Sequence, residues 1–176
     1  MHVKEAIERR RSIRKFTETV VPDGLVRDVI DAGRRAPSGS NAQPLRVFVA
    51  RSKETGGVLR KAKVFEQGFV TKAPAVFVIC GDPAVYGEGE TESLKGKNQE
   101  RCLRDLSIAS AFMALRATEL GLASCYVGLM DRHALKRALG IPDEYMVPFV
   151  LCLGYPDENP SPMRRKSLEE TILGGL

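Results

Sequence analysis

One segment of the chain, residues 99–120, is too apolar for an ordinary surface helix. A surface helix shows an apolar stripe toward the core and polar residues on its opposite side. Here apolar residues occur around most of the circumference, so we expect a central, largely buried helix or one that forms a subunit interface. Gly121 is expected to end this helix. Its apolar residues are Leu103, Leu106, Ala109, Ala111, Phe112, Met113, Leu115 and Leu120.

A second apolar segment, residues 75–80, has the length of a strand and contains no polar side chain. Such a run is typical of a central strand that is buried on both faces. Elsewhere strand-like and helix-like patterns alternate, which indicates an α/β or α+β fold with helices packed on a mixed sheet. The other expected strands are 45–50, 124–128 and 145–153, and the other expected helices are 3–10, 52–63, one from Pro22-Asp23 to Pro37, and one from Asp131 to Gly140.

Two segments lack the periodicity of helices and strands. Residues 82–98 are dominated by glycine and charge, and we expect a mobile loop there. Residues 156–176 are rich in proline and charge and are expected to form a C-terminal tail. The apolar segments on both sides of the loop need each other for a core, so residues 1–176 are expected to form a single domain.

Composition narrows the classes of function. No apolar run approaches the roughly 18–20 residues of a membrane span, and the N-terminus has no signal-peptide pattern, so a cytoplasmic location is expected. The four cysteines are widely spaced, which predicts buried free thiols and no metal site. Residues 1–63 carry 15 Lys and Arg against 7 Asp and Glu, yet aromatic residues make up only 6% of the chain. Such a basic half can bind nucleic acid or acidic small molecules, but most of these side chains are expected to form a solvated basic surface. Nucleic acid is disfavoured because aromatic residues are few and no recognisable DNA- or RNA-binding motif occurs.

Two polar motifs near the N-terminus carry the strongest chemical signal. Arg10, Arg11, Ser12 and Arg14 offer guanidinium forks and a hydroxyl, the groups that hold a phosphate best. The segment 36–44, APSGSNAQP, offers hydroxyls, amides and backbone N–H groups just before a strand, which suits a flat heterocycle with polar edges. Together the two motifs indicate a phosphorylated aromatic cofactor.

Two further elements are compatible with the same ligand. Residues 121–128, GLASCYVG, are mostly small, and small residues let the backbone approach a ligand closely. Residues 154–156, GYP, are followed by the basic cluster Arg164-Arg165-Lys166, which could complete a phosphate site begun by Arg10 and Arg14. No GxGxxG or GxxxxGK[ST] pattern occurs, so the chain encodes neither a dinucleotide fingerprint nor a P-loop.

In this order the four elements resemble the nitroreductase family of FMN-dependent oxidoreductases, and the match extends from about residue 7 to residue 170. The resemblance implies an α+β fold, an intertwined homodimer and two FMN sites at the subunit interface. It also implies that the first motif and the basic tail hold the phosphate and ribityl chain of FMN. The second motif would border the flavin ring, partly from the partner subunit. By motif position the site residues are Arg10, Arg11, Ser12, Arg14, Pro37, Ser38, Asn41, Gln43, Gln67, Tyr126, Val127, Gly128, Arg164 and Arg165.

Some positions depart from the family pattern. Leu45 stands where an aromatic residue often follows Gln-Pro, Tyr126 stands where tryptophan is frequent, and Met163 falls where some members have lysine. Glu66 falls near an asparagine that contacts the flavin in some members, and the neighbouring Gln67 is the residue that we assign to that contact.

The resemblance implies a ping-pong reaction in which NAD(P)H gives hydride to flavin N5 and a nitroaromatic, quinone or similar acceptor then takes the electrons. No catalytic side chain is required, because the cofactor carries the chemistry. Two alternatives remain open. One is a same-fold flavoenzyme with another reaction, such as reductive dehalogenation, dehydrogenation or flavin cleavage. The other is a non-enzymatic nucleotide-binding protein.

Overall fold

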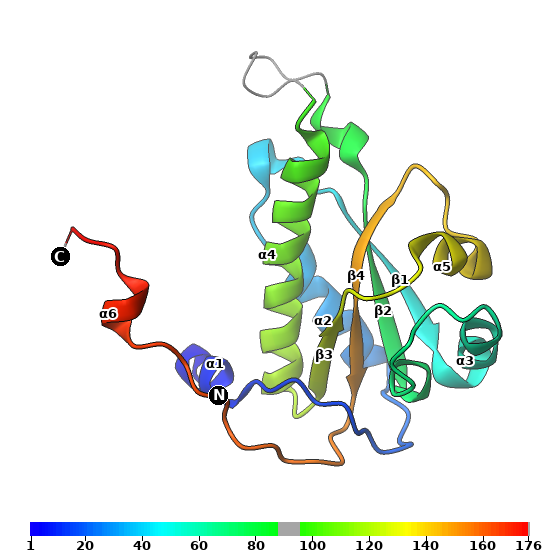
Figure 1. Cartoon of the computed structure of the whole chain (residues 1–176), viewed down its shortest axis with the longest axis horizontal. Helices are drawn as coiled ribbons and strands as arrows, with labels where there is room; N and C mark the ends of the chain where they lie inside the picture. The colour runs from blue at the N-terminus through cyan, green and yellow to red at the C-terminus, as the bar shows by residue number, and fades with distance from the viewer. Residues whose placement is uncertain (88–95, 176) are drawn as a thin grey trace.

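The computed structural model describes residues 1–87 and 96–175, and its centre is a four-stranded sheet (Figure 1). The strands β1 (Leu45–Arg51), β2 (Ala75–Gly81), β3 (Ala123–Val127) and β4 (Met146–Gly154) lie in the order β1-β2-β4-β3. Their three pairings are antiparallel. A mixed sheet was expected from the sequence. Within the described residues, the parallel pairing is an isolated bridge between Ser12 and Ser124, outside the four strands.

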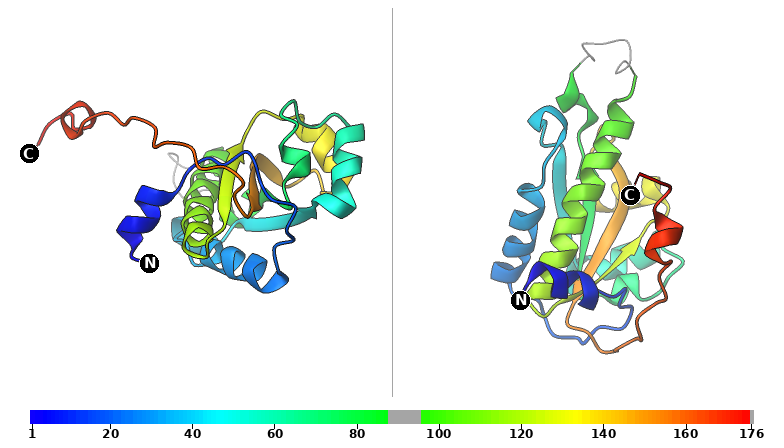
Figure 2. Two further views of the ribbon diagram at one scale, coloured as in Figure 1. Left: turned by 90° about the horizontal axis from the view of Figure 1, so that it is seen from below. Right: turned by 90° about the vertical axis from the view of Figure 1, so that its left-hand side faces the viewer.

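Strand β2 is buried at all seven positions, as its unbroken apolar sequence predicts. Val76 and Val78 face a core covered by α3 (Ser52–Lys61) and α5 (Arg132–Leu139). Phe77 and Ile79 face the opposite core, covered by α2 (Asp23–Arg34) and α4 (Asn98–Glu119). Figure 2 shows the two helical layers on either side of the sheet. The strand alternates its side chains between the faces, so each face needs its own helical cover.

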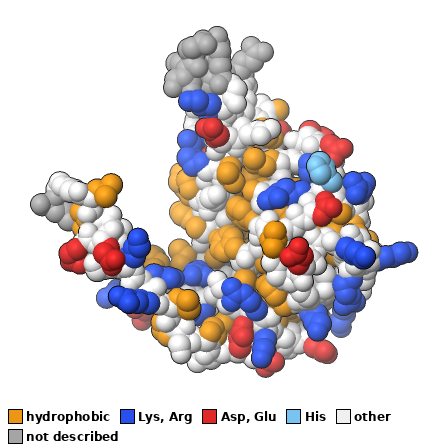
Figure 3. Space-filling view, in the orientation of Figure 1, with side chains coloured by type: hydrophobic (Ala, Val, Ile, Leu, Met, Phe, Trp, Pro, Cys, Tyr) orange, Lys and Arg blue, Asp and Glu red, His pale blue; other side chains and the backbone are white. Residues whose placement is uncertain are grey.

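Helix α4 is the long apolar helix expected over 99–120. It was expected to be either largely buried or part of a subunit interface. One side is buried against the sheet and α2 through residues such as Leu106 and Met113, each 0% exposed. Leu103 and Phe112, each 42% exposed, lie nine residues or half a turn out of phase, so they flank the buried side at its two margins. Apolar side chains are also visible over this helix in Figure 3. Exposed apolar side chains beside a buried helix face are typical of a contact with a partner.

The glycine-rich segment 82–98 is more ordered at its start than the sequence predicts. Residues Pro83–Tyr86 form a short 3-10 helix, and Tyr86 is only 9% exposed. Asp82 accepts a hydrogen bond from the N–H of Ala84 and so caps this turn. Asn98 already belongs to α4. The expected loop therefore begins with a regular turn, its mobility stays a prediction, and residues 88–95 lie outside the described part.

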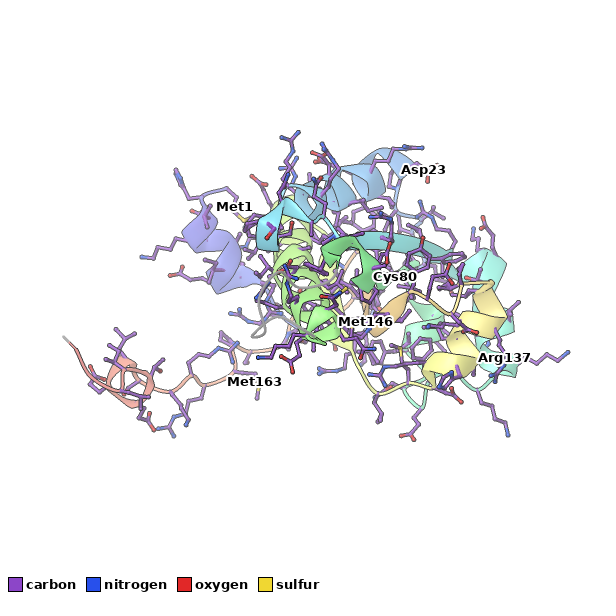
Figure 4. All side chains as sticks on the ribbon, turned by 90° about the horizontal axis from the view of Figure 1, so that it is seen from above. Met1, Asp23, Cys80, Arg137, Met146 and Met163 are labelled. Atoms are coloured by element: carbon purple, nitrogen blue, oxygen red, sulfur yellow. The ribbon has the colours of Figure 1, made fainter. Side chains whose placement is uncertain are left out.

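The two ends of the chain run over and beyond the core. Helix α1 (Val3–Arg9) packs against α4, and the chain then passes beneath the sheet (Figure 1). After β4 the tail extends away from the body, with Met163 on it (Figure 4), and it contains a helix that the sequence did not predict, α6 (Leu168–Thr171). A capping box between Ser167 and Glu170 explains this short helix.

No helix among residues 1–87 and 96–175 is long and apolar enough to cross a membrane. All four cysteines are free and buried, as their spacing predicts. Burial raises the pKa of the Cys80 and Cys102 thiols to about 11. These thiols therefore stay protonated and unreactive at neutral pH.

Two glycine substitutions test the packing with opposite expected signs. A Cβ at Gly81 in β2 would overlap Cys102 and lie 2.6 Å from Leu106 of α4, whereas one at Gly57 in α3 would meet nothing within 4 Å. We expect Gly81→Ala to lower the free energy of unfolding by about 1–3 kcal/mol through overpacking. Gly57→Ala should raise it by about 0.5–1 kcal/mol, because alanine is the better helix former. Urea unfolding measures both, and equal effects would contradict this packing.

Candidate functional site

The first motif lies alongside the edge strand β3. The N–H of Ile13 donates to the carbonyl of Ser124 at 3.1 Å, next to the parallel bridge between Ser12 and Ser124. Glu158 holds the following residues, because its carboxylate accepts hydrogen bonds from the backbone N–H groups of Arg14 and Lys15. These backbone bonds, that of Arg14 first, lower the pKa of Glu158, so the carboxylate is ionised at neutral pH. The motif is therefore held in place by hydrogen bonds that its backbone N–H groups donate.

The three arginines of this motif differ in what they contact. The guanidinium of Arg11 donates to the carbonyl oxygens of Glu8 and Arg10, at the C-terminal end of α1. The guanidinium of Arg14 makes one long contact, 3.4 Å, with the carbonyl of Ser12. A cavity of about 360 Å³ opens beside the motif. It is lined by Arg9, Arg10, Arg11, Ile13, Thr118, Gly121, Leu122, Ala123, Pro156, Glu158, Asn159, Pro160 and Pro162.

The second motif forms a tight turn with unusual backbone dihedrals. Residues Gly39–Asn41 are a short 3-10 turn, and Ser40, Asn41 and Gln43 have φ of 53°, 54° and 50°. Non-glycine residues in this left-handed region are uncommon, and such strain gathers at functional sites. The N–H of Gln43 donates to the hydroxyl of Ser38 at 3.0 Å, which closes the turn on itself.

A buried carboxylate connects this turn to α4. Asp105 is 3% exposed and its Oδ2 atom accepts from the N–H of Gly39 at 2.8 Å and from the hydroxyl of Tyr86 at 2.7 Å. Its Oδ1 atom accepts from Arg104 at 3.0 Å. Burial raises the pKa of Asp105, but the hydrogen bonds from Tyr86, Gly39 and Arg104 outweigh it and lower the pKa overall. The group is therefore a buried anion with its acceptors in use.

The third motif ends strand β3. Tyr126 is 37% exposed and its ring lies edge-on to Phe149 with centroids 5.5 Å apart, while Val127 is buried. The guanidinium of Arg132 donates to the carbonyl of Gly128 at 3.2 Å and to that of Pro148 at 2.9 Å. Arg132 thus ties the backbone at the end of β3 to the neighbouring strand β4.

Two buried polar atoms near these elements have no hydrogen-bond partner within the described protein. One is Oε1 of Gln67, and the other is the hydroxyl of Ser124, which lies beside Ser12. The loop that holds Gln67 is joined to the end of β3 through the bond from the Asp131 N–H to the Val64 carbonyl, at 2.9 Å. Unpartnered buried polar groups are costly, so atoms of this kind mark places where a ligand or water completes the structure.

Comparison with known proteins identifies the family of this chain. A sequence profile described as "Nitroreductase family" matches residues 7–61 and 56–155. The chain belongs to the nitroreductase family. It is 32% identical to a protein named NADH dehydrogenase from Thermus thermophilus, over 98% of this chain and 96% of that one. It is 30% identical to the NADPH-flavin oxidoreductase of Vibrio harveyi, over 89% of this chain and 66% of that one.

A solved structure supports the family membership at the level of the fold. The chain superposes on a nitroreductase of Desulfovibrio desulfuricans, solved in complex with FMN, with a TM-score of 0.85 and 28% identity. The overlap covers 100% of this chain and 98% of that chain. The expected α+β fold with helices flanking the sheet is therefore confirmed.

This nitroreductase-family chain does not bring all its predicted site residues together. The cavity beside Arg10 is lined by Thr118 at the C-terminal end of α4, whereas the turn 38–43 contacts Asp105 near the N-terminal end. Thirteen residues of helix separate these positions, a distance of about 20 Å along the axis. Pro37, Ser38 and Gln43 line a different cavity, of about 380 Å³, between α2, β1 and α4.

The tail arginines follow Pro162, which still lines the cavity beside Arg10. Arg164 and Arg165 are exposed on the extended segment beyond Pro160, which points away from the body in Figures 1 and 4. Among the described residues, no ion pair or hydrogen bond joins these two side chains to the body of the same chain. Their assignment to the phosphate therefore stays a prediction.

Sequence reasoning missed Asp105, Tyr86 and Arg132, which hold the site loops in place. Asp105 had a detectable signal, because it is an acidic residue that follows Cys102 at helical spacing within the buried stripe of α4. Tyr86 lies in a glycine-rich segment that has no periodic pattern. Arg132 follows an N-cap, a position where an exposed arginine is ordinary.

Proposed function

We infer that the protein is an FMN-dependent NAD(P)H oxidoreductase, and we propose that it passes electrons to a nitroaromatic, a quinone or a similar electron-poor acceptor. The observation that carries this is the Arg10–Arg14 segment, fixed along the edge of β3 and beside a cavity lined by arginine. Guanidinium groups bind phosphate bidentately, and a hydroxyl such as that of Ser12 adds a neutral donor. The Desulfovibrio relative solved with FMN supports the choice of cofactor.

The residues present fit FMN in several respects. Arg10, Ser12 and Arg14 would hold its phosphate and ribityl chain, and the unpartnered Oε1 of Gln67 supplies an acceptor for an N–H edge of the ring. The backbone around Gly128, tied to β4 by Arg132, would meet the N5 and O4 edge of the ring. When bound, FMN supplies hydride acceptance from NAD(P)H and onward electron transfer.

We propose that the site is completed by a second copy of the chain. Asp105, which meets the second motif, and Thr118, which lines the cavity beside Arg10, lie about 20 Å apart along α4. Two copies of α4 packed antiparallel about a two-fold axis would bring Asp105 of one beside Thr118 of the other. The exposed Phe112, between these two positions, provides an apolar side chain for that contact. Arg164 and Arg165 could then reach a phosphate across the interface.

The protein's own groups have a limited part in the proposed ping-pong reaction. They bind and orient the cofactor, and the arginines favour its anionic reduced form by charge. No described side chain is required as nucleophile or general base, so acceptor identity depends on access to the ring. The proposed location remains cytoplasmic, where NADH and NADPH are available.

A spectrum followed by turnover tests this function. The purified protein is incubated with FMN and passed over a desalting column, and the retained flavin is quantified by absorbance. We expect about one FMN per chain, bleached by NADH or NADPH without oxygen and recovered on addition of a quinone. Retained flavin without quinone turnover would favour the dehalogenase, dehydrogenase or flavin-cleavage alternatives. A colourless protein would contradict the proposal and favour a nucleotide-binding protein.

A further inference from the structure

Asp105 is unusual among the acidic residues of this chain. Among the residues that the structure describes, few polar or charged side chains are buried, and Asp105, with 3% exposure, is the acidic one. Its three hydrogen-bond donors come from separate places: Gly39 in the turn after α2, Tyr86 in the turn after β2, and Arg104 in α4. Burying a carboxylate is costly unless its acceptors are satisfied, so such an arrangement needs a compensating role.

The turn that it contacts cannot hold its shape by local forces alone. Ser40, Asn41 and Gln43 all lie in the left-handed region, at a cost of about 1 kcal/mol or more for each residue. The bond from the Gln43 N–H to Ser38 is local to the turn. The bond from the Gly39 N–H to Asp105 spans 66 residues of sequence and reaches the buried side of α4. Arg46 of β1 also donates to the Gln43 carbonyl, at 3.1 Å, but the bond to Asp105 is the one that joins the strained turn to a buried group distant in sequence.

The same oxygen atom also fixes the turn after β2. Tyr86 donates its hydroxyl to Oδ2 of Asp105, and the guanidinium of Arg101 lies 4.4 Å from the centre of the Tyr86 ring. Both residues that donate to Oδ2 therefore depend on one ionised carboxylate. Pro37, Ser38 and Gln43, which follow or flank the tethered glycine, line the 380 Å³ cavity together with Asp105.

We propose that Asp105 is a positioning residue for the flavin site: through Gly39 it holds the strained 38–43 turn in the conformation that borders the cofactor. The inference rests on the function proposed above, in which Ser38, Asn41 and Gln43 meet the flavin. In this proposal Asp105 acts on the cofactor through the turn.

Asp105→Leu is the direct test, because leucine has a similar size and removes both carboxylate oxygens. An amide at this position could keep the bonds from Gly39 and Tyr86 with its oxygen, whereas leucine has no acceptor for Gly39, Tyr86 or Arg104. We expect the dissociation constant for FMN, measured by quenching of flavin fluorescence, to rise roughly tenfold to a hundredfold. We also expect faster amide hydrogen exchange in residues 36–44 of the protein without FMN, and unchanged exchange in β2 and β4.

Leu106→Ala is the matched control for a merely structural effect. Leu106 is the next residue of α4, is 0% exposed and packs in the core, so its truncation lowers Tm without removing the carboxylate. We expect Leu106→Ala to leave FMN affinity within about twofold of wild type at temperatures well below its Tm. Sedimentation velocity checks that the variants and the wild type have the same oligomeric state.

Turnover as a function of FMN concentration separates positioning from loss of folded protein. For Asp105→Leu we expect the half-saturating FMN concentration to rise at least about tenfold while kcat at saturating FMN stays within about twofold. Unchanged FMN affinity, a loss equal to that of Leu106→Ala, or unchanged exchange in residues 36–44 would overturn the inference. If wild type itself binds no FMN, the proposed function fails first, and hydrogen exchange still reports whether Asp105 holds the turn.

Discussion

Replacing Arg10 and Arg14 together by alanine is expected to weaken FMN binding by at least about a hundredfold and to leave the fold intact. Each arginine would contribute charge-assisted hydrogen bonds to the phosphate, worth about 1.5–3 kcal/mol apiece. The backbone of this segment is held by Ser124 and Glu158 through main-chain bonds, which alanine retains. Fluorescence titration with FMN measures the affinity, and circular dichroism confirms that Tm is nearly unchanged.

The control for this variant removes the same charge elsewhere. Arg60 in α3 and Arg137 in α5 are exposed on the opposite layer of the molecule. Arg60→Ala with Arg137→Ala lowers the net charge by the same two units, so it reports any general electrostatic attraction of the anion. We expect its FMN affinity to stay within about threefold of wild type. Equal losses in both double variants would refute the phosphate assignment.

Phe112→Glu is expected to separate the two subunits and to remove bound FMN at the same time. Phe112 is 42% exposed at one margin of the buried side of α4, where we propose that the second subunit packs. A carboxylate at the centre of such an interface must be dehydrated without a partner, at a cost of several kcal/mol. Sedimentation velocity should show a dimer for wild type and a monomer for the variant, and the desalted variant should be colourless.

Val58→Glu is the matched control for the interface. Val58 is 47% exposed on α3, which covers the other face of the sheet. We expect this variant to stay dimeric and to keep its flavin, because the new charge remains in water. A wild-type protein that sediments as a monomer, or a monomeric Phe112→Glu that retains FMN, would show that one chain builds the site alone.

Local patterns in the sequence predicted most of the secondary structure. Strand β2 was expected over 75–80 and spans Ala75–Gly81, because an unbroken apolar run of that length is stable only between two covered faces. Helix α4 was expected over 99–120 and spans Asn98–Glu119. Both signals are local, since periodicity and end residues act within a few positions of the chain. Helix α6 was missed because its four residues carry no periodic pattern.

The sequence by itself determined the family, the chemistry of the motifs and the order of the elements. Only the tertiary structure decided which of these motifs lie together. The first motif and β3 are adjacent although more than 100 residues separate Ser12 from Ser124. The first and second motifs, close in sequence, lie at opposite ends of α4. Residue types and spacing specify what a segment can bind, but packing around a shared core specifies where it points. The buried partners of Asp105 are likewise set by that packing, because hydrogen bonds between distant segments leave no local pattern.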